Sequence, residues 1–239
     1  GIQYNSISST SNVIDIQTPA QLVVSSFTIP ARASRGQIFT VTMTVTNNGQ
    51  GTVTGVYPQP NPLQDIGDGV IMPVSFPTPV DLLGGSAATF TWNYQAIGNG
   101  TSNLQGDAEG IDVNSGITIK SAMRTTGNCV VVEPAALASL MSVSPSTTYN
   151  GIDFTVVLAV TNTAGTGGSD AINVSPVALA INEIGATAIL VSSPSPANVT
   201  ISGGAAHNFT WIYRASGAGE ITFSSFAMGQ DSNTLQVVS

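Results

Sequence analysis

The stretch Phe39-Thr-Val-Thr-Met-Thr-Val-Thr-Asn47 alternates apolar side chains with threonines at a strict period of two. Successive side chains of an extended strand point to opposite faces, so one face of this segment is apolar and the other is polar. The period, together with the β-branched and aromatic residues, predicts a half-buried antiparallel strand.

The same stretch recurs as Phe154-Thr-Val-Val-Leu-Ala-Val-Thr-Asn162, displaced by 115 residues. Four further matches follow in the same order: Pro19-Ala-Gln-Leu22 with Pro134-Ala-Ala-Leu137, Ile66-Gly67 with Ile184-Gly185, Phe90-Thr-Trp92 with Phe209-Thr-Trp211, and Asp112-x-Asn114 with Asp231-x-Asn233. Self-similarity at one period indicates tandem structural repeats. We place the repeats at residues 10–124 and 125–239, joined by a short linker near residues 124–127.

A third, partial copy precedes the first repeat. Gly1-Ile-Gln-Tyr-Asn-Ser6 resembles Gly116-Ile-Thr-Ile-Lys-Ser121, and each is followed by a polar stretch and an apolar run. We interpret residues 1–9 as the last strand of a preceding repeat. These residues lack the sandwich that they would complete, so either disorder or pairing with an exposed edge of a neighbouring chain is expected.

The spacing of strand and turn signals predicts an all-β chain without helical periodicity. We expect two tandem immunoglobulin-like antiparallel β-sandwiches of about seven strands each, with a closed barrel as the less favoured alternative. Six prolines between Pro58 and Pro79 place that segment at sheet edges and in loops, because proline cannot donate to a central ladder.

Composition excludes several classes of protein. Five basic and 13 acidic residues give a net charge of −8, which disfavours nucleic acid and anionic lipid as partners. A single cysteine, Cys129, excludes an intrachain disulfide. No apolar run reaches the roughly 18 residues of a membrane-spanning helix, so we expect no direct membrane insertion, and an export signal would lie outside this sequence.

Three runs carry a resemblance to a known group: Phe39 to Gly49, Gly84 to Trp92, and Gly110 to Gly116. They are similar to the tandem repeats of bacterial and archaeal surface proteins, most of all the CARDB-type cell-adhesion-related domains. The resemblance covers both repeats and implies an immunoglobulin-like fold at an extracellular or cell-surface location. It transfers no binding residues.

Catalytic motifs are absent from the sequence. The only histidine, His207, has Ala88 as its counterpart in the first repeat, and no G-x-S-x-G elbow occurs. One Cys and one His do not assemble a zinc site of the usual kind. We therefore expect no catalytic residues, no enzyme activity and no bound cofactor, apart from the calcium alternative considered next.

An oxygen-rich stretch offers four candidate calcium ligands: Asp107, Glu109, Asp112 and Asn114. Only the last two persist in the second repeat, as Asp231 and Asn233. The alternative is a hairpin turn, because Asp and Asn side chains bond the local backbone.

A second candidate site is an aromatic stripe: Trp92 and Tyr94, with Trp211 and Tyr213 in the second repeat. Such a face stacks on sugar rings when it is exposed, and packs the sandwich core when it is buried. The core is the favoured interpretation, because each repeat has few other large side chains.

These observations predict a non-catalytic extracellular structural or adhesion module, part of a repeat array that acts as a spacer or binding stalk. Its expected partners are other repeats of the same protein, with a cell-surface protein or a polysaccharide as further candidates. The alternative is a carbohydrate-binding accessory module of a secreted hydrolase, which predicts exposed Trp92 and Trp211.

Overall fold

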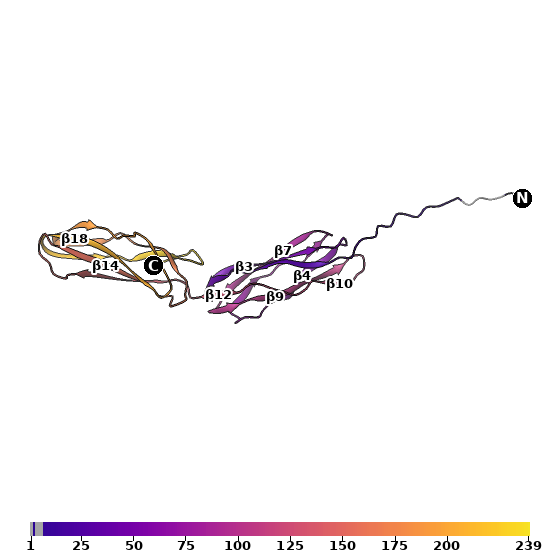
Figure 1. Ribbon diagram of the computed structural model, residues 1–239, viewed down its shortest axis with the longest axis horizontal. Helices are drawn as coiled ribbons and strands as arrows, with labels where there is room; N and C mark the ends of the chain where they lie inside the picture. Colours follow the sequence, from indigo (N-terminus) through magenta and orange to yellow (C-terminus); the bar gives the residue numbers. More distant parts are fainter. Residues whose placement is uncertain (1, 3–6) are drawn as a thin grey trace.

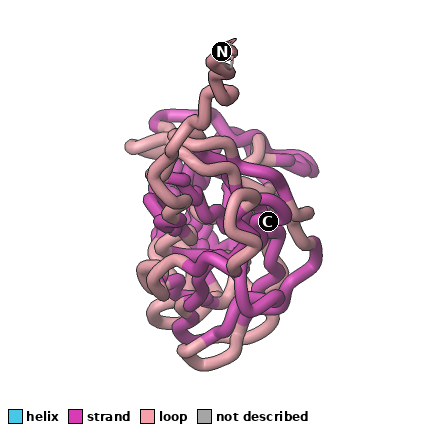
Figure 2. The backbone as a smooth tube through the Cα atoms, turned by 90° about the vertical axis from the view of Figure 1, so that its right-hand side faces the viewer, coloured by secondary structure: helices cyan, strands magenta, loops and turns pink. Residues whose placement is uncertain are grey.

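The computed structural model describes residue 2 and residues 7–239. Figure 1 shows two β-rich bodies arranged end to end, with an extended N-terminal segment leaving the far end of the first. In the end-on view of Figure 2, strands and their connecting loops make up the described chain. The predicted all-β sandwich fold is confirmed, and the prediction that residues 1–9 are a strand remnant falls partly outside the described residues.

The first body, called here the N-terminal sandwich, contains strands β1 to β12. One sheet has the order β1 (Leu22–Thr28), β3 (Ile38–Asn47), β7 (Ala87–Ala96), β5 (Ile71–Ser75). The facing sheet has the order β10 (Thr118–Lys120), β9 (Leu104–Asp112), β4 (Val53–Asp65), β6 (Val80–Leu82), and β11 (Arg124–Thr125) also pairs with β9. A three-stranded sheet of β2 (Arg32–Ser34), β12 (Cys129–Val132) and β8 (Gly100–Ser102) closes one end.

The second body, the C-terminal sandwich, contains strands β13 to β20. One sheet has the order β13 (Leu137–Ser144), β14 (Asp153–Asn162), β18 (Ala206–Ser224), β16 (Ala180–Ser192). The other has the order β17 (Val199–Ile201), β15 (Ala171–Pro176), β19 (Ala227–Asp231), β20 (Val237–Val238). Each sandwich has its own cluster of buried apolar side chains.

The alternating segment that predicted a strand is β3. Val41, Met43 and Val45 are fully buried, and β3 pairs with β7 so that Val41 lies opposite Trp92. β14 pairs with β18 in the same manner, with Val156 opposite Trp211. Apolar residues at every second position therefore fill the space between the sheets, as the period of a strand requires.

A buried asparagine ends each of these strands. The Asn47 side chain donates to the carbonyls of Gly51 and Leu82 and accepts from the amides of Gln21 and Gly49. Asn162 makes the corresponding four bonds in the C-terminal sandwich. Because each amide is fully satisfied, its burial fixes the loop that surrounds it.

The end of the N-terminal sandwich lies beyond the position predicted from the repeats. Cys129 and Val131 are buried at 0% and 2% exposure in the first core, whereas the boundary was expected at residue 124. Ala135 already belongs to the second core. Glu133 and Pro134 are thus all that separates the two packed regions.

Candidate functional site

The closing strand of the N-terminal sandwich, β12, is inserted between two neighbours. It runs parallel to β2, with Val131 opposite Ala33, and antiparallel to β8, with Val131 opposite Gly100. Cys129 and Val131 point into the core, while Val130 between them is 39% exposed. Burial, with the charge of Asp65, raises the pKa of the Cys129 thiol to about 11, as expected for a thiol used in packing.

The C-terminal sandwich has the walls of this arrangement without the inserted strand. The counterparts of β2 and β8 are residues 147–149 and 219–221, from the displacements of 115 and 119 residues between the repeats. These two segments line an open groove of about 640 Å³, called here the C-terminal groove. Among the described residues no strand pairs with this side of residues 219–221, whose other side pairs with β16.

The floor of the C-terminal groove is apolar. It is formed by Phe154, Ala186, Ala215 and Phe223. Phe223 packs on Phe154 and Tyr213 with ring centroids at 5.9 and 5.2 Å, yet it is only half-buried. Its counterpart Leu104 in the N-terminal sandwich is fully buried. Phe223 is less buried than Leu104, and it lies at the place that corresponds to the part of the first core covered by β12.

The backbone of the groove wall matches the wall that β12 occupies. The amide of Gly151 donates to the carbonyl of Ala215 at 2.8 Å, and the amide of Gly36 donates to that of Ala96 at the same distance. The amide of Ile152 donates to Tyr149 as that of Gln37 does to Ser34. The turn is therefore formed without the strand that lies beside it in the N-terminal sandwich.

Hydrogen-bonding groups of this wall are available to an incoming strand. In the N-terminal sandwich, Val130 donates to the carbonyl of Ala31 at 3.0 Å, and Arg35 donates to that of Val132 at 2.7 Å. The counterparts on the groove wall are the carbonyl of Ser146 and the amide of Asn150. Neither has a hydrogen-bond partner among the described residues. The groove thus combines an apolar floor with unpaired backbone groups, which is the chemistry of a strand acceptor.

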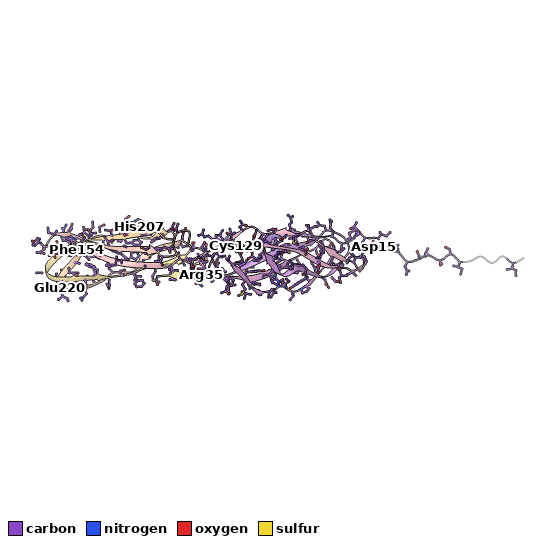
Figure 3. The ribbon with its side chains drawn as sticks, turned by 90° about the horizontal axis from the view of Figure 1, so that it is seen from below. Asp15, Arg35, Cys129, Phe154, His207 and Glu220 are labelled. Atoms are coloured by element: carbon purple, nitrogen blue, oxygen red, sulfur yellow. The ribbon has the colours of Figure 1, made fainter. Side chains whose placement is uncertain are left out.

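The two sandwiches meet through a polar junction beside β12. The buried hydroxyl of Ser34 donates to both carboxylate oxygens of Asp231, at 3.0 and 3.1 Å. The Asp231 carboxylate also accepts from the amide of Ala135 at 2.7 Å. On the surface, the Arg35 guanidinium binds Glu133 at 2.7 Å. Figure 3 shows Arg35 and Cys129 at this junction, with Phe154 and Glu220 at the far end of the C-terminal sandwich.

The aromatic stripe proposed as a sugar-binding face is part of the core. Trp92 and Tyr94 are 0% and 1% exposed, and Trp211 and Tyr213 are 7% and 5% exposed. Burial, with the nearby charge of Asp65, raises the pKa of Tyr94 to about 12. The favoured interpretation of a core stripe is therefore confirmed, because these rings fill the space between the sheets, and the exposed tryptophans that the carbohydrate-binding alternative predicts are not observed. The carbohydrate-binding alternative is withdrawn for that reason.

The calcium candidates do not form one site. Glu109 binds Lys120 at 3.1 Å, and Asp107 lies 4.0 Å from the same ammonium group. Asp112 accepts from the amides of Asn114 and Ser115, as the hairpin-turn interpretation predicts, and also from the amide of Ala20 on another segment. Within residue 2 and residues 7–239, no three His, Cys, Asp or Glu side chains gather as a metal site would require.

The Asn114 side chain takes no part in a metal-like cluster either, since it donates to Gln17 at 3.0 Å.

The histidine that was set aside as non-catalytic, His207, lies at the start of β18 and packs edge-on against Phe209 at 4.9 Å between ring centroids. The groove at the far end was not among the sites considered from the sequence.

Comparisons with known proteins leave the family open. No protein-family model matches the chain, and no curated relative matches it. Among solved structures, the secreted serine protease VesC from Vibrio cholerae is similar with a TM-score of 0.28 and 10% identity over 85% of this chain. The match covers 51% of that protease chain, so the chain spans about half of it.

This finding corrects two expectations. The chain was expected to be a non-catalytic adhesion or spacer module and not an enzyme, whereas a solved structure to which it is similar is that of a secreted enzyme. Both expectations are withdrawn. A likeness at this TM-score carries no argument for protease activity in this chain.

The described residues include no helix of the length and apolar character needed to cross a bilayer.

Proposed function

We propose that the C-terminal sandwich binds an extended polypeptide segment by strand addition. The observation that carries this proposal is the position-by-position match between the C-terminal groove and the place that β12 fills in the N-terminal sandwich. Strand addition gives affinity through main-chain hydrogen bonds and specificity through alternate side chains.

The geometry around β12 defines the ligand class. The bound segment would run parallel to residues 146–150 and antiparallel to residues 219–221. It needs two apolar residues separated by one position, in the places of Cys129 and Val131, because those two side chains reach the core. The position between them faces outward, as that of Val130 does, so many different side chains are tolerated there.

The resemblance to repeats of surface proteins and an extracellular or cell-surface location remain part of this proposal. They are supported by the sequence motifs that both repeats share. Strand addition at an open edge is a mode of recognition that sandwiches of this type make available.

The proposal is tested by supplying the strand in cis. A copy of residues 121–133, carrying Cys129→Val to prevent oxidation, is fused after Ser239 of the full chain. We expect slower hydrogen exchange at residues 148, 150, 219 and 221. We also expect a rise of about 5 °C or more in the midpoint of thermal unfolding of the C-terminal sandwich, since about 1 kcal/mol shifts a domain of this size by that much.

A matched control fusion carries Asp at both inward positions of the added strand, the copies of Cys129 and Val131. It should leave exchange in the groove walls unchanged, because a carboxylate is not accepted on an apolar floor. Equal exchange in the unfused chain and in the apolar fusion would sink the proposal.

A pair of wall variants locates the binding in the groove. Thr148 is the counterpart of Ala33, so Thr148→Ala reproduces the wall of the filled site and should keep protection in the apolar fusion. Thr148→Pro removes an amide hydrogen from the wall and should abolish that protection. Thr148 lies outside any strand, so neither change disturbs a described ladder.

A further inference from the structure

We infer that the C-terminal groove selects an extended segment in which a Lys or Arg lies between two apolar residues. The inference rests on the proposed function and names the chemical class of the ligand. The two apolar side chains cover the floor, and the basic side chain between them lies on the outer side of the groove. The preference comes from Glu220 and Tyr149, which lie on the two walls.

The outward position of the bound strand has neighbours of opposite charge in the two sandwiches. In the N-terminal sandwich, Val130 lies opposite Arg32 of β2 and opposite Thr101 of β8. The displacements of 115 and 119 residues give Thr147 and Glu220 as the counterparts of these two neighbours on the groove walls. The charge beside the outward position is therefore positive where β12 lies and negative in the groove.

Glu220 would face the side chain at this outward position. Phe223 packs on Phe154 at the floor of the groove, so the alternation along β18 directs Ile221 to the same side and Glu220 to the outer side. Residues directly opposite each other on antiparallel strands have Cβ atoms about 4.5–5.5 Å apart. A basic side chain in the place of Val130 can therefore form an ion pair with the Glu220 carboxylate.

The Glu220 carboxylate is available for such a pair. Its side chain is exposed, and within residue 2 and residues 7–239 no basic side chain forms an ion pair with it. Arg214, on the same strand, binds Asp153 at 2.7 Å. Among the described residues that line the groove, none is basic. A cation on the ligand would thus supply the charge that the walls lack.

The other wall favours a long cationic side chain. Tyr149 is 84% exposed, and its counterpart Ser34 pairs with Val132, two positions beyond Val130. Tyr149 is thus a diagonal neighbour of the outward position, within reach of a long side chain on the same face of the sheet. A Lys or Arg can lie across its ring in a cation–π contact. In the N-terminal sandwich, Ser34 binds Asp231 instead.

Other residue types fit the outward position less well. Asp or Glu would lie directly opposite Glu220, and like charges in that arrangement are destabilising. The net charge of −8 on the chain adds to the repulsion of an acidic ligand. A short neutral residue such as Val avoids the repulsion but makes neither the ion pair nor the contact with Tyr149. The expected order of binding is therefore basic, then neutral, then acidic.

This order is measured with the full chain that carries the fused copy of residues 121–133 with Cys129→Val. That fusion is the reference, and two further fusions carry Val130→Lys or Val130→Asp in the copy, called the lysine and aspartate fusions. Protection from hydrogen exchange at residues 148, 150, 219 and 221 should rise about threefold with lysine and fall about threefold with aspartate. In about 1 M salt the spread between the two fusions should shrink to about twofold.

Substitutions on the walls assign the preference to its side chains. Glu220→Gln should bring the lysine and aspartate fusions within about twofold of each other, and Glu220→Lys should reverse their order. Tyr149→Ser reproduces the residue found beside β12 and should lower protection in the lysine fusion alone, by about twofold. Both native side chains are exposed, so neither substitution removes a core contact.

Asp15→Asn is the matched control for net charge. Asp15 is exposed, and Figure 3 shows it at the end of the molecule away from Glu220. Its substitution removes one negative charge, as Glu220→Gln does, and should leave the spread between the lysine and aspartate fusions unchanged, because the distance exceeds the screening length of about 10 Å.

The results separate this inference from the proposed function. If the three fusions are equally protected, the preference for a basic residue is wrong and strand binding stands. If the order of the fusions survives Glu220→Lys, or if Asp15→Asn reduces the spread as much as Glu220→Gln, recognition by Glu220 is wrong. If no fusion protects the groove walls, both the inference and the proposed function are wrong.

Discussion

The two sandwiches share a backbone and a set of buried contacts but differ at the end that faces away from the N-terminal segment. In the first, β12 lies in the sheet and Ala33 is fully buried. In the second, the counterpart Thr148 is half-buried and residues 147–149 form no strand. The difference shows that β2 owes its strand conformation to its partner, while the turn that follows it forms in either case.

The largest effect is expected at the end of the N-terminal sandwich where β12 lies between β2 and β8. Val131→Asp should destabilise the N-terminal sandwich by on the order of 4 kcal/mol, because it buries an unpaired carboxylate in the core. Ile16 precedes Val131 by the 115 residues that relate the repeats, but its side chain is 85% exposed. Ile16→Asp should therefore leave the free energy of unfolding unchanged. Urea unfolding of both variants at low protein concentration measures the contrast, and equal losses would break the comparison.

A smaller effect is expected at the two buried asparagines, where the sandwiches are alike. Asn47→Ala and Asn162→Ala each orphan two carbonyls and two amides, and should each cost about 2–4 kcal/mol. The two losses should agree within about 1 kcal/mol if the shared scaffold contributes equally to both sandwiches. Separate unfolding transitions followed by hydrogen exchange would report them, and a much smaller loss at one asparagine would contradict the equivalence.

The smallest expected effect is the loss of folding stability at low pH through Asp112 and Asp231. The pKa of Asp112 is lowered mainly by its bond from the Ser115 amide, and then by that from Ala20. Burial raises the pKa of Asp231, but the bonds from Ala135 and Thr234 outweigh it, so the pKa is lowered on balance. A lowered folded-state pKa contributes stability above the ordinary value of 3.8, and this contribution is lost as pH falls through the folded value.

The Asp231→Asn variant should therefore be less stable than the native chain at about pH 7 and should approach it at about pH 3. Urea midpoints at the two pH values measure this. The Asp112→Asn variant should behave alike, because its turn is the same. A constant difference at both pH values would show that the carboxylate charge does not matter at these turns.

Much of the scaffold was predictable from the sequence. Strict alternation identified β3 and β14 because both strands are half-buried in a sheet. The recurrence of Trp92 as Trp211 indicated equivalent cores, and burial of both rings follows from the lack of other large side chains in each sandwich. The Asp112 turn followed from the backbone-bonding tendency of Asp and Asn.

The groove was not predictable in the same way. Strand patterns report which face of a segment is buried, but they do not report whether a neighbouring strand is present. The sequence does carry one signal of this strand, because Ile14 and Ile16 precede Cys129 and Val131 by the 115 residues that relate the repeats. Compared only as apolar runs, the two segments do not reveal which positions correspond. The boundary was placed at residue 124 for the same reason, since β12 continues past a polar stretch that resembles a linker.

The short connection between the sandwiches has a mechanical consequence. Val132 is held in a sheet on one side, and Ala135 is packed in the second core, so Glu133 and Pro134 offer little slack. Tension applied along the chain would reach the N-terminal sandwich through β12, which is hydrogen-bonded along both edges. Such a strand yields only when its parallel and antiparallel bonds shear together, whereas a terminal strand held along one edge peels bond by bond.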